Sequence, residues 1–444
     1  MNRALPSLES VASCLGGYDP SALPVGMAQD FVARYVQAIT QVEPVGLREA
    51  LGRVLAQDLV SPINVPAQDN SAMDGYALAS ADLADDGPTT LRVLGKAFAG
   101  GAPATAPQRG ECVRIMTGAV MPPGCDTVLP QEFVAQTFPA VGTASPLPRQ
   151  AGESFISFAP GIVKAGDNRR LAGEDLAVGE PALRAGRVLR PADIGIAASL
   201  GQATLPVWRK LRVAFFSTGD ELRAVGEPLD PGCVYDSNRY TLHAMLTRLG
   251  VEVLDLGVVR DDPVALAATF LDAAARADAI ITSGGVSVGE ADHTKQVMAR
   301  LGEVAFWTIA MRPGRPMAFG SIASGDRRAV LFGLPGNPVA VMVTFYAFVR
   351  EALLQMAGAT PAPLPLLRAR AAVPIRKKPG RTEYQRGIVE RGTDGDWTVR
   401  LTGGQGSGIL RSMSEANGLI VLHHSQGAVA AGDWLDVLPF DGLI

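Results

Sequence analysis

Residues 278–295 read DAIITSGGVSVGEADHTK, a short apolar run followed by small residues and then by charged and hydroxyl groups. The apolar run predicts a buried strand. The small residues after it let backbone N–H groups approach an oxyanion closely, since glycine adopts positive φ without penalty. The expected anion site comprises Ser283, Gly284, Gly285 and Ser287. The charged groups that follow, Asp292 among them, suit chemistry on phosphate esters or phosphoanhydrides, although a plain glycine-rich connection is the alternative.

Apolar runs followed by polar motifs recur over residues 208–358. Apolar strands are expected at 211–219, 251–259, 278–285 and 329–336, and amphipathic helices at 240–250, 264–277 and 338–356. This alternation predicts a doubly wound, mostly parallel α/β sheet covered on both faces, in which ligands bind beyond the carboxyl ends of the strands. Four polar motifs directly follow strands: STGDEL (217–222), TSGGVSVGEAD (282–292), MRPGRP (311–316) and GLPGNP (333–338). We therefore expect them to converge on one edge of the sheet.

Carboxylates gather among these motifs. Glu221, Asp261 and Asp292 are all expected near the same edge, where two like charges about 4 Å apart repel by about 4 kcal/mol at an effective dielectric constant near 20. A bound cation would relieve this repulsion, and oxygen ligands favour Mg²⁺. Helix capping is the competing role for these acids, and it is favoured for Asp262, which precedes a proline at the start of a helix.

Two of the motifs supply basic side chains and backbone amides, which could bind an anion. Arg312 and Arg315 are held in a proline-rich loop, and guanidinium groups bind phosphate or other oxyanions through two parallel hydrogen bonds. Gly336 and Asn337 precede a helix, whose first amides could hold an anion. For the two arginines, the alternative is a pair of solvated surface charges. For Gly336 and Asn337, the alternative is a simple strand-to-helix turn capped by Asn337.

Composition shifts along the chain predict its domains. We expect an N-terminal polar tail at 1–26, a discontinuous linker domain at 27–62 and 164–207, a β-rich insert at 63–163, the α/β domain at 208–358 and a C-terminal β-barrel at 359–444. Helical spacing extends from Met27 to Gly52, with a break at Pro44. The insert contains two irregular polar loops, which carry Asp74 and Thr117, and their residue types fit either function or turn chemistry.

Charge and composition exclude several classes of protein. A net charge of −4 gives no reason to expect a nucleic-acid partner. The longest apolar stretch, Val339–Val349, is shorter than the roughly 20 residues of a membrane span, and no signal peptide is visible, so a cytoplasmic protein without a membrane partner is expected. The four cysteines are widely spaced, which favours reduced thiols. With only four histidines, metal ligands are expected to be oxygens.

The chain resembles the molybdopterin molybdenumtransferase family (MoeA, or gephyrin E-domain). The resemblance rests on an ordered set of motifs that spans roughly Met27 to Ile444: DNSAMDGYA (69–77), RIMTGAVMPPGCDTV (114–128), GEDL (173–176), FSTGDEL (216–222), YDSNR (235–239), TSGGVSVGEADHTK (282–295), MRPGRPMAFG (311–320) and GLPGNP (333–338). It implies an elongated linker domain, a β-rich insert, a molybdopterin-binding α/β domain and a C-terminal barrel. It also implies a homodimer with its active cleft between chains.

The resemblance implies a reaction in which adenylylated molybdopterin and molybdate react with the help of Mg²⁺. The phosphoanhydride is cleaved, AMP is released and molybdenum remains on the dithiolene sulfurs. Carried over motif by motif, the catalytic residues are Asp74, Thr117, Glu221 and Asp292, with Glu221 and Asp292 as metal ligands. The substrate-binding residues are Arg170, Asp175, Asp261, Ser283, Gly284, Gly285, Ser287, Arg312, Arg315, Gly336 and Asn337.

Two features depart from the family pattern. Arginine stands at both basic positions of the MRPGRP loop, where the family often has lysine, and the basic run that ends at Arg170 is short. Two other functions remain open: a molybdopterin adenylyltransferase, which needs only the α/β domain and would otherwise be a transient partner, and a non-catalytic scaffold.

Overall fold

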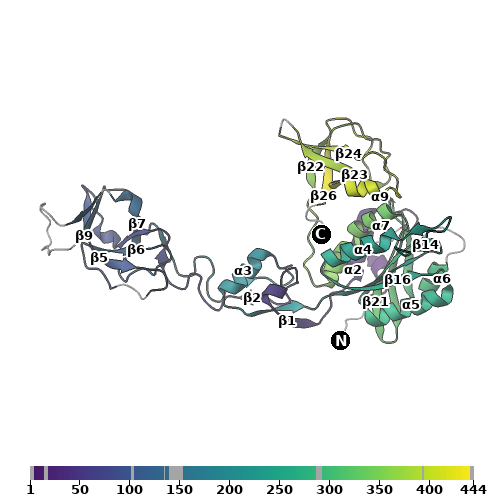
Figure 1. The fold of residues 1–444 in the computed structure, drawn as a ribbon, viewed down its shortest axis with the longest axis horizontal. Helices are drawn as coiled ribbons and strands as arrows, with labels where there is room; N and C mark the ends of the chain where they lie inside the picture. The colour runs from purple at the N-terminus through teal and green to yellow at the C-terminus, as the bar shows by residue number, and fades with distance from the viewer. Residues whose placement is uncertain are drawn as a thin grey trace. The chain divides into compact units, whose positions relative to one another are not determined.

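The computed structural model describes residues 5–14, 19–101, 105–134, 136–139, 154–286, 293–392 and 395–440. The chain divides into two compact units, and Figure 1 labels helices and strands of both. The first comprises Met1–Gln57, Gly186–Arg190 and Leu205–Ile444, and the second comprises Asp58–Ala185 and Pro191–Thr204.

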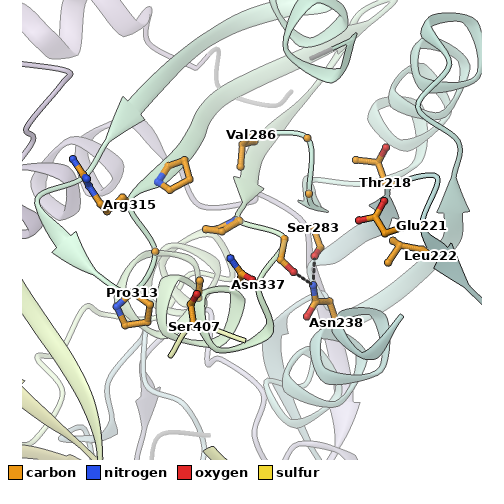
Figure 2. A pocket seen from close by; sticks show the side chains of 18 of the residues that line it. Thr218, Glu221, Leu222, Asn238, Ser283, Val286, Pro313, Arg315, Asn337 and Ser407 are labelled. Atoms are coloured by element: carbon orange, nitrogen blue, oxygen red, sulfur yellow. Dashed lines mark hydrogen bonds between the residues drawn. The ribbon is translucent and has the colours of Figure 1, made fainter. Parts of the chain in front are cut away.

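The first unit contains a six-stranded α/β sheet. Its strand order is β16 (Glu252–Val259), β13 (Arg212–Thr218), β17 (Ala279–Ser283), β21 (Arg327–Leu334), β20 (Pro316–Ser324) and β18 (Gly302–Thr308). The first four strands are mutually parallel, and β20 runs antiparallel to both of its neighbours. The expected mostly parallel sheet is therefore present, with the antiparallel β20 as an element that the alternation did not predict. The carboxyl ends of β13, β17 and β21 lead to the side chains drawn in Figure 2.

Helices cover both faces of this sheet because its strands are apolar on both sides. One face packs against α5 (Pro263–Arg276) and α6 (His293–Leu301). The other packs against α2 (Val25–Tyr35), α4 (Ser237–Arg248), and the continuous helix formed by α7 (Pro338–Thr344), the π-helical η4 (Phe345–Val349) and α8 (Arg350–Met356). Residues Pro338–Met356 are long and apolar enough to cross a membrane, but 72% of the most apolar window is buried inside the protein, as in the core helix of a soluble protein.

The C-terminal strands close into a barrel. Strands β23 (Thr382–Arg391), β24 (Trp397–Leu401), β22 (Leu367–Ala371), β26 (Trp434–Pro439) and β25 (Gly418–Leu422) pair in that order, and β25 pairs back with β23. A short strand from the α/β part, β19 (Met311–Arg312), adds to β23 in parallel. This pairing places the MRPGRP loop beside the barrel.

The second unit carries the insert. Its six-stranded sheet has the order β7 (Thr127–Pro130), β4 (Gly75–Leu78), β6 (Glu111–Ile115), β5 (Thr89–Ala97), β9 (Ser154–Phe158) and β8 (Gln136–Pro139). Two short two-stranded ribbons connect the insert to the rest of the chain. One pairs β3 (Asn70–Ser71) with β10 (Arg169–Arg170), and the other pairs β2 (Leu59–Val60) with β11 (Pro181–Leu183). Helix α3 (Pro191–Ser199) follows.

Two N-terminal segments differ from their sequence interpretation. The helical spacing over residues 27–52 holds only to the end of α2. Beyond it, β1 (Val42–Gly46) pairs with β12 (Thr204–Trp208), because backbone pairing with a distant strand outweighs local periodicity. The segment expected to be a loose tail forms α1 (Leu8–Cys14) and makes backbone hydrogen bonds to the sheet.

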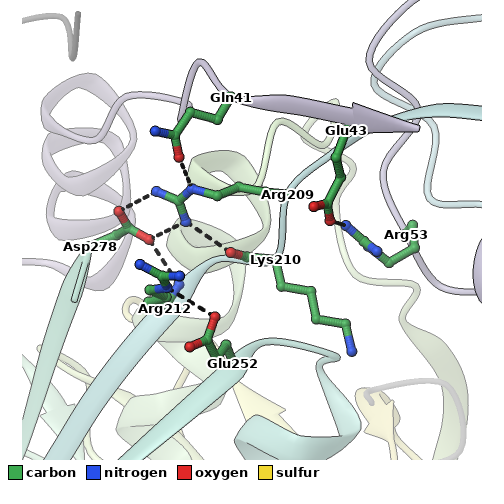
Figure 3. A network of polar contacts seen from close by, with 8 residues as sticks. All are labelled: Gln41, Glu43, Arg53, Arg209, Lys210, Arg212, Glu252 and Asp278. Carbon is green, nitrogen blue, oxygen red and sulfur yellow. Dashed lines mark hydrogen bonds and ion pairs between the residues drawn. The ribbon is translucent and has the colours of Figure 1, made fainter. Parts of the chain in front are cut away.

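A buried ion pair fixes the start of the central strands (Figure 3). Arg209 donates two hydrogen bonds to Asp278, from Nη1 to Oδ2 at 2.8 Å and from Nη2 to Oδ1 at 2.7 Å. The Asp278 side chain is 6% exposed, and it also accepts from the Arg212 backbone N–H at 2.8 Å. Asp278 therefore ties the start of β17 to β13 through both a charge pair and the main chain.

We expect Arg209→Ala to lower the free energy of unfolding by about 3–5 kcal/mol, because it leaves the buried Asp278 carboxylate without its counter-charge. The control is Arg212→Ala. Its pair with Glu252 is about half exposed and should contribute about 0–1 kcal/mol. Urea unfolding of both variants measures the difference, and equal losses would show that Arg209 contributes no more than a surface charge.

Candidate functional site

A cavity of about 1030 Å³ opens at the carboxyl edge of the α/β sheet (Figure 2). Residues of all four polar motifs line it, as do three residues that follow β24 in the C-terminal region, Gln405, Gly406 and Ser407. The motifs lie together because β13, β17 and β21 are adjacent parallel strands and β18 points the same way across the sheet. Of the sequence-predicted residues, the cavity lining includes Glu221, Asp261, Ser283, Gly284, Gly285, Arg312, Arg315, Gly336 and Asn337.

The turn after β17 requires its glycines. Gly284 and Gly285 have φ of +96° and +66°, a region that other residues rarely adopt. A Cβ on Gly284 would lie 2.5 Å from the Thr218 carbonyl oxygen, and one on Gly285 would lie 2.5 Å from Thr294 Oγ1. Close packing of this turn against β13 and α6 therefore excludes side chains and leaves main-chain groups at the cavity wall.

Asn238 connects two of the motifs, and sequence reasoning did not identify it as a site residue. From the first turn of α4, its Nδ2 donates to Ser283 Oγ at 2.8 Å and to the Gly336 carbonyl oxygen at 2.7 Å (Figure 2). Its Oδ1 is buried and has no partner among the described residues. The signal that could have found it is its place in YDSNR, two residues after Asp236, whose carboxylate caps α4.

Carboxylates occupy one side of the cavity. Glu221 and Asp261 both line it, and Thr294 Oγ1 lies 3.5 Å from Asp261 Oδ1. The hydroxyl of Thr218, which also lines the cavity, is buried without a partner among the described residues. These donors are all oxygens, the ligand type that Mg²⁺ prefers, so they fit that ion in kind. Among the described residues, no group of three or more His, Cys, Asp or Glu side chains is placed to hold a metal ion, and Asp292, like Ser287, lies outside those residues.

The opposite side is basic. Arg312 and Arg315 line the cavity, and Figure 2 shows Arg315 across from Glu221. Close to Arg312, Arg386 is only 1% exposed, and it donates to the Gly406 carbonyl oxygen at 2.9 Å and to Ser412 Oγ at 3.0 Å. Burial, together with the nearby Arg312 charge, lowers the pKa of Arg386 to about 10, so it stays protonated at neutral pH.

Arg386 matters because its described hydrogen bonds go to hydroxyl and carbonyl oxygens, none of which neutralises it. A buried, uncompensated cation raises the positive potential at the adjacent Arg312. This end of the cavity is therefore suited to a dianion. Sequence reasoning missed Arg386 because it lies within a β-strand, where an arginine gives no sign of burial.

The remaining predicted residues lie in the second unit. Thr117 donates to Asp74 Oδ1 from both its backbone N–H and its hydroxyl, each at 2.7 Å. These two bonds, with the Arg114 charge, hold the pKa of Asp74 below its usual value, so it is ionised at neutral pH. Arg170 is exposed in β10, opposite Asn70, and Asp175 is exposed where its backbone N–H bonds to the Val65 carbonyl oxygen.

Comparison with known families covers most of the chain. Residues 23–201 match the MoeA N-terminal region (domain I and II), residues 214–355 match a probable molybdopterin binding domain, and residues 368–440 match the MoeA C-terminal region (domain IV). The three matches follow one another in the order of the MoeA architecture.

Relatives and solved structures are similar over nearly their whole length. Molybdopterin molybdenumtransferase of Haemophilus influenzae is 41% identical over 406 residues, 91% of this chain and 95% of that protein. The Nostoc enzyme of the same name is 36% identical, over 88% of this chain and 87% of its own. The crystal structure of the molybdopterin biosynthesis moeA protein from Pyrococcus horikoshii superposes with a TM-score of 0.78 at 27% identity, covering 95% of this chain and 100% of that one.

Proposed function

Because the chain belongs to the molybdopterin molybdenumtransferase family, we propose that it inserts molybdenum from molybdate into adenylylated molybdopterin, cleaving the phosphoanhydride and releasing AMP. The observation that carries this proposal is the division of one cavity into an acidic side, a main-chain turn and a basic side. A substrate that joins two phosphates and reacts with a second anion needs these three environments together.

The turn and Asn238 would hold the phosphate next to the pterin. The glycines at 284 and 285 let backbone N–H groups approach it without steric hindrance, and Asn238 fixes Ser283 and Gly336 relative to each other. A rigid wall of this kind orients the phosphoanhydride before reaction, which lowers the entropic part of the barrier.

Glu221 and Asp261 would hold Mg²⁺, with Asp292 as the further expected ligand. Bound there, the ion supplies charge neutralisation of the phosphate oxygens and Lewis-acid polarisation of the phosphorus. The chain's own part is to bring oxygen donors to the edge of the sheet, where Glu221 follows β13 and Asp261 follows β16. Water attacks the phosphorus of the molybdopterin phosphate and loses a proton to solvent, the bond from that phosphorus to the bridging oxygen breaks, and the bridging oxygen leaves as part of AMP.

Molybdate would occupy the basic side. Arg312 and Arg315 can each donate paired N–H groups to its oxygens, and the buried Arg386 adds charge that no described carboxylate neutralises. Oxyanion and phosphoanhydride then lie in the same cavity, so that AMP release and molybdenum transfer can be coupled.

The main competing activity is adenylylation of molybdopterin. Incubation with ATP and molybdopterin, without molybdate, separates the two. We expect no adenylylated product from this chain, and we expect AMP from adenylylated molybdopterin once molybdate is added. Formation of adenylylated product from ATP would instead assign the chain to the preceding step. In our proposal a separate adenylyltransferase supplies the substrate by transient contact, in the cytoplasm.

We propose that the enzyme is a homodimer in which the Asp74 and Thr117 pair of one copy serves the cavity of the other. Mixing tests this. Asp74→Ala and Glu221→Gln should each be inactive alone, while a mixture allowed to exchange subunits should recover about one quarter of the wild-type rate, since half of the dimers contain one intact site of two. A mixture that stays inactive despite proven subunit exchange would place both residues in the same chain's site.

A further inference from the structure

The N-terminal segment, comprising described residues 5–14 and 19–24, packs along the edge of the α/β sheet, and we call it the N-terminal strap. Its helix α1 buries Val11, which is 5% exposed, against the same core that contains α2 and the sheet. The Leu8 backbone N–H at the start of α1 donates to Glu303 Oε1 on β18 at 2.6 Å. Side-chain and backbone contacts therefore anchor the first part of the strap to the edge strand.

The second part of the strap pairs with the chain where β18 ends. Thr308 N–H donates to the Pro20 carbonyl oxygen at 2.8 Å, and Leu23 N–H donates to the Thr308 carbonyl oxygen at 3.1 Å. Ala310 N–H then donates to the Leu23 carbonyl oxygen at 2.7 Å, and the Leu23 side chain is 1% exposed. Leu23 thus holds the two residues on either side of Ile309.

These contacts end where the arginine loop begins. Ile309 N–H closes the loop by donating to the Arg315 carbonyl oxygen at 2.6 Å. On its other side, the Ala310 carbonyl oxygen accepts from Thr382 N–H of the barrel at 2.9 Å. The base of the loop that carries Arg312 and Arg315 is therefore clamped between the strap and the barrel.

We propose that the N-terminal strap is a positioning element for the oxyanion end of the site, acting through residues 308–310 on Arg312 and Arg315. The ligand of that end rests on the function proposed above. Most of the strap precedes residue 23, where the family match begins, so the family match does not account for it. A strap that only covered the exposed edge of β18 would stabilise the sheet without changing oxyanion binding.

The test compares two variants of the full chain. The release variant, Val11→Asp with Glu303→Ala, removes the buried apolar side chain of α1 and the acceptor of the Leu8 N–H. The control variant, Glu9→Ala with Glu303→Gln, changes an exposed residue of α1 and retains an oxygen acceptor for Leu8 N–H. Amide hydrogen exchange measures how often the backbone hydrogen bonds of Thr308, Ile309 and Ala310 open. Titration calorimetry with molybdate alone measures the oxyanion affinity.

For the release variant we expect amide exchange at all three residues to rise at least about tenfold. We expect the molybdate dissociation constant to rise roughly fivefold, because a loop that must be ordered on binding loses affinity. The control variant should match wild type. Unchanged exchange at Ile309, or increased exchange with unchanged molybdate affinity, would overturn the proposal and leave the strap as an edge cover. A wild-type protein that binds no molybdate would overturn the ligand assignment instead, and exchange at Ile309 would still decide whether the strap holds the loop.

Discussion

Glu221→Gln is expected to lower the rate of AMP release from adenylylated molybdopterin by about 10²–10³-fold, the usual effect of removing one electrostatic group from a reacting centre. Glutamine keeps the size and one oxygen of the side chain but removes the charge that would hold Mg²⁺ at the acidic side of the cavity. Single-turnover measurement of AMP, at several Mg²⁺ concentrations, checks it. Partial recovery at high Mg²⁺ is expected, since a weakened metal site fills at higher concentration.

The matched control for this prediction is Glu227→Gln. Glu227 lies a few residues beyond Glu221 but lines a different cavity, and its carboxylate accepts from the Ala224 backbone N–H at 3.0 Å. Its replacement should change AMP release less than about twofold, because a surface substitution away from the site has little effect. Equal rates for Glu221→Gln and wild type would remove Glu221 from the reaction.

The double variant Arg312→Ala with Arg315→Ala is expected to raise the molybdate concentration for half-maximal rate by about 10²-fold or more. Hydrogen bonds to charged groups contribute about 1.5–3 kcal/mol each, and at least one is lost with each arginine. The measurement is the rate of molybdenum insertion against molybdate concentration, with adenylylated molybdopterin saturating. Since Arg312 pairs with Glu383 through the backbone, the alanine variant keeps the β19 pairing with the barrel.

Two further variants serve as controls for this prediction. Arg327→Ala removes an exposed arginine at the start of β21 and should leave the molybdate dependence unchanged. Arg312→Lys with Arg315→Lys keeps both charges but replaces the planar fork by a compact ammonium, so it should recover most of the affinity. If the alanine variant alters the overall rate but not the molybdate dependence, the basic side of the cavity does not bind the oxyanion.

Much of the fold was predictable because local and global signals agree. Asp262 was expected to cap a helix, and its carboxylate accepts from the N–H groups of Val264 and Ala265 at 3.1 and 2.8 Å. The glycine turn after β17 was visible for the same reason. Its small residues follow an apolar strand, and the structure shows that neighbouring groups leave no room for a Cβ at Gly284.

Other features depend on contacts between distant residues, which no local pattern reveals. Arg386 is buried because the loop after β24 and the short helix α9 (Leu410–Glu415) enclose it, and neither neighbour is close in sequence. Residues 42–46 have helical spacing yet form a strand, since their partner lies about 160 residues later. The strap looked like a polar tail because it contributes backbone groups to its hydrogen bonds with the sheet, and every sequence has such groups.

Single-turnover AMP release by the wild-type enzyme, with and without molybdate, tests the central claim most directly. The claim is that one cavity binds the phosphoanhydride and the oxyanion at opposite sides and couples their reactions. It predicts that molybdate accelerates AMP release, and that the acceleration is lost in the Arg312→Ala, Arg315→Ala variant. AMP release that proceeds at the same rate without molybdate, or that responds to it equally in the variant, would contradict the claim.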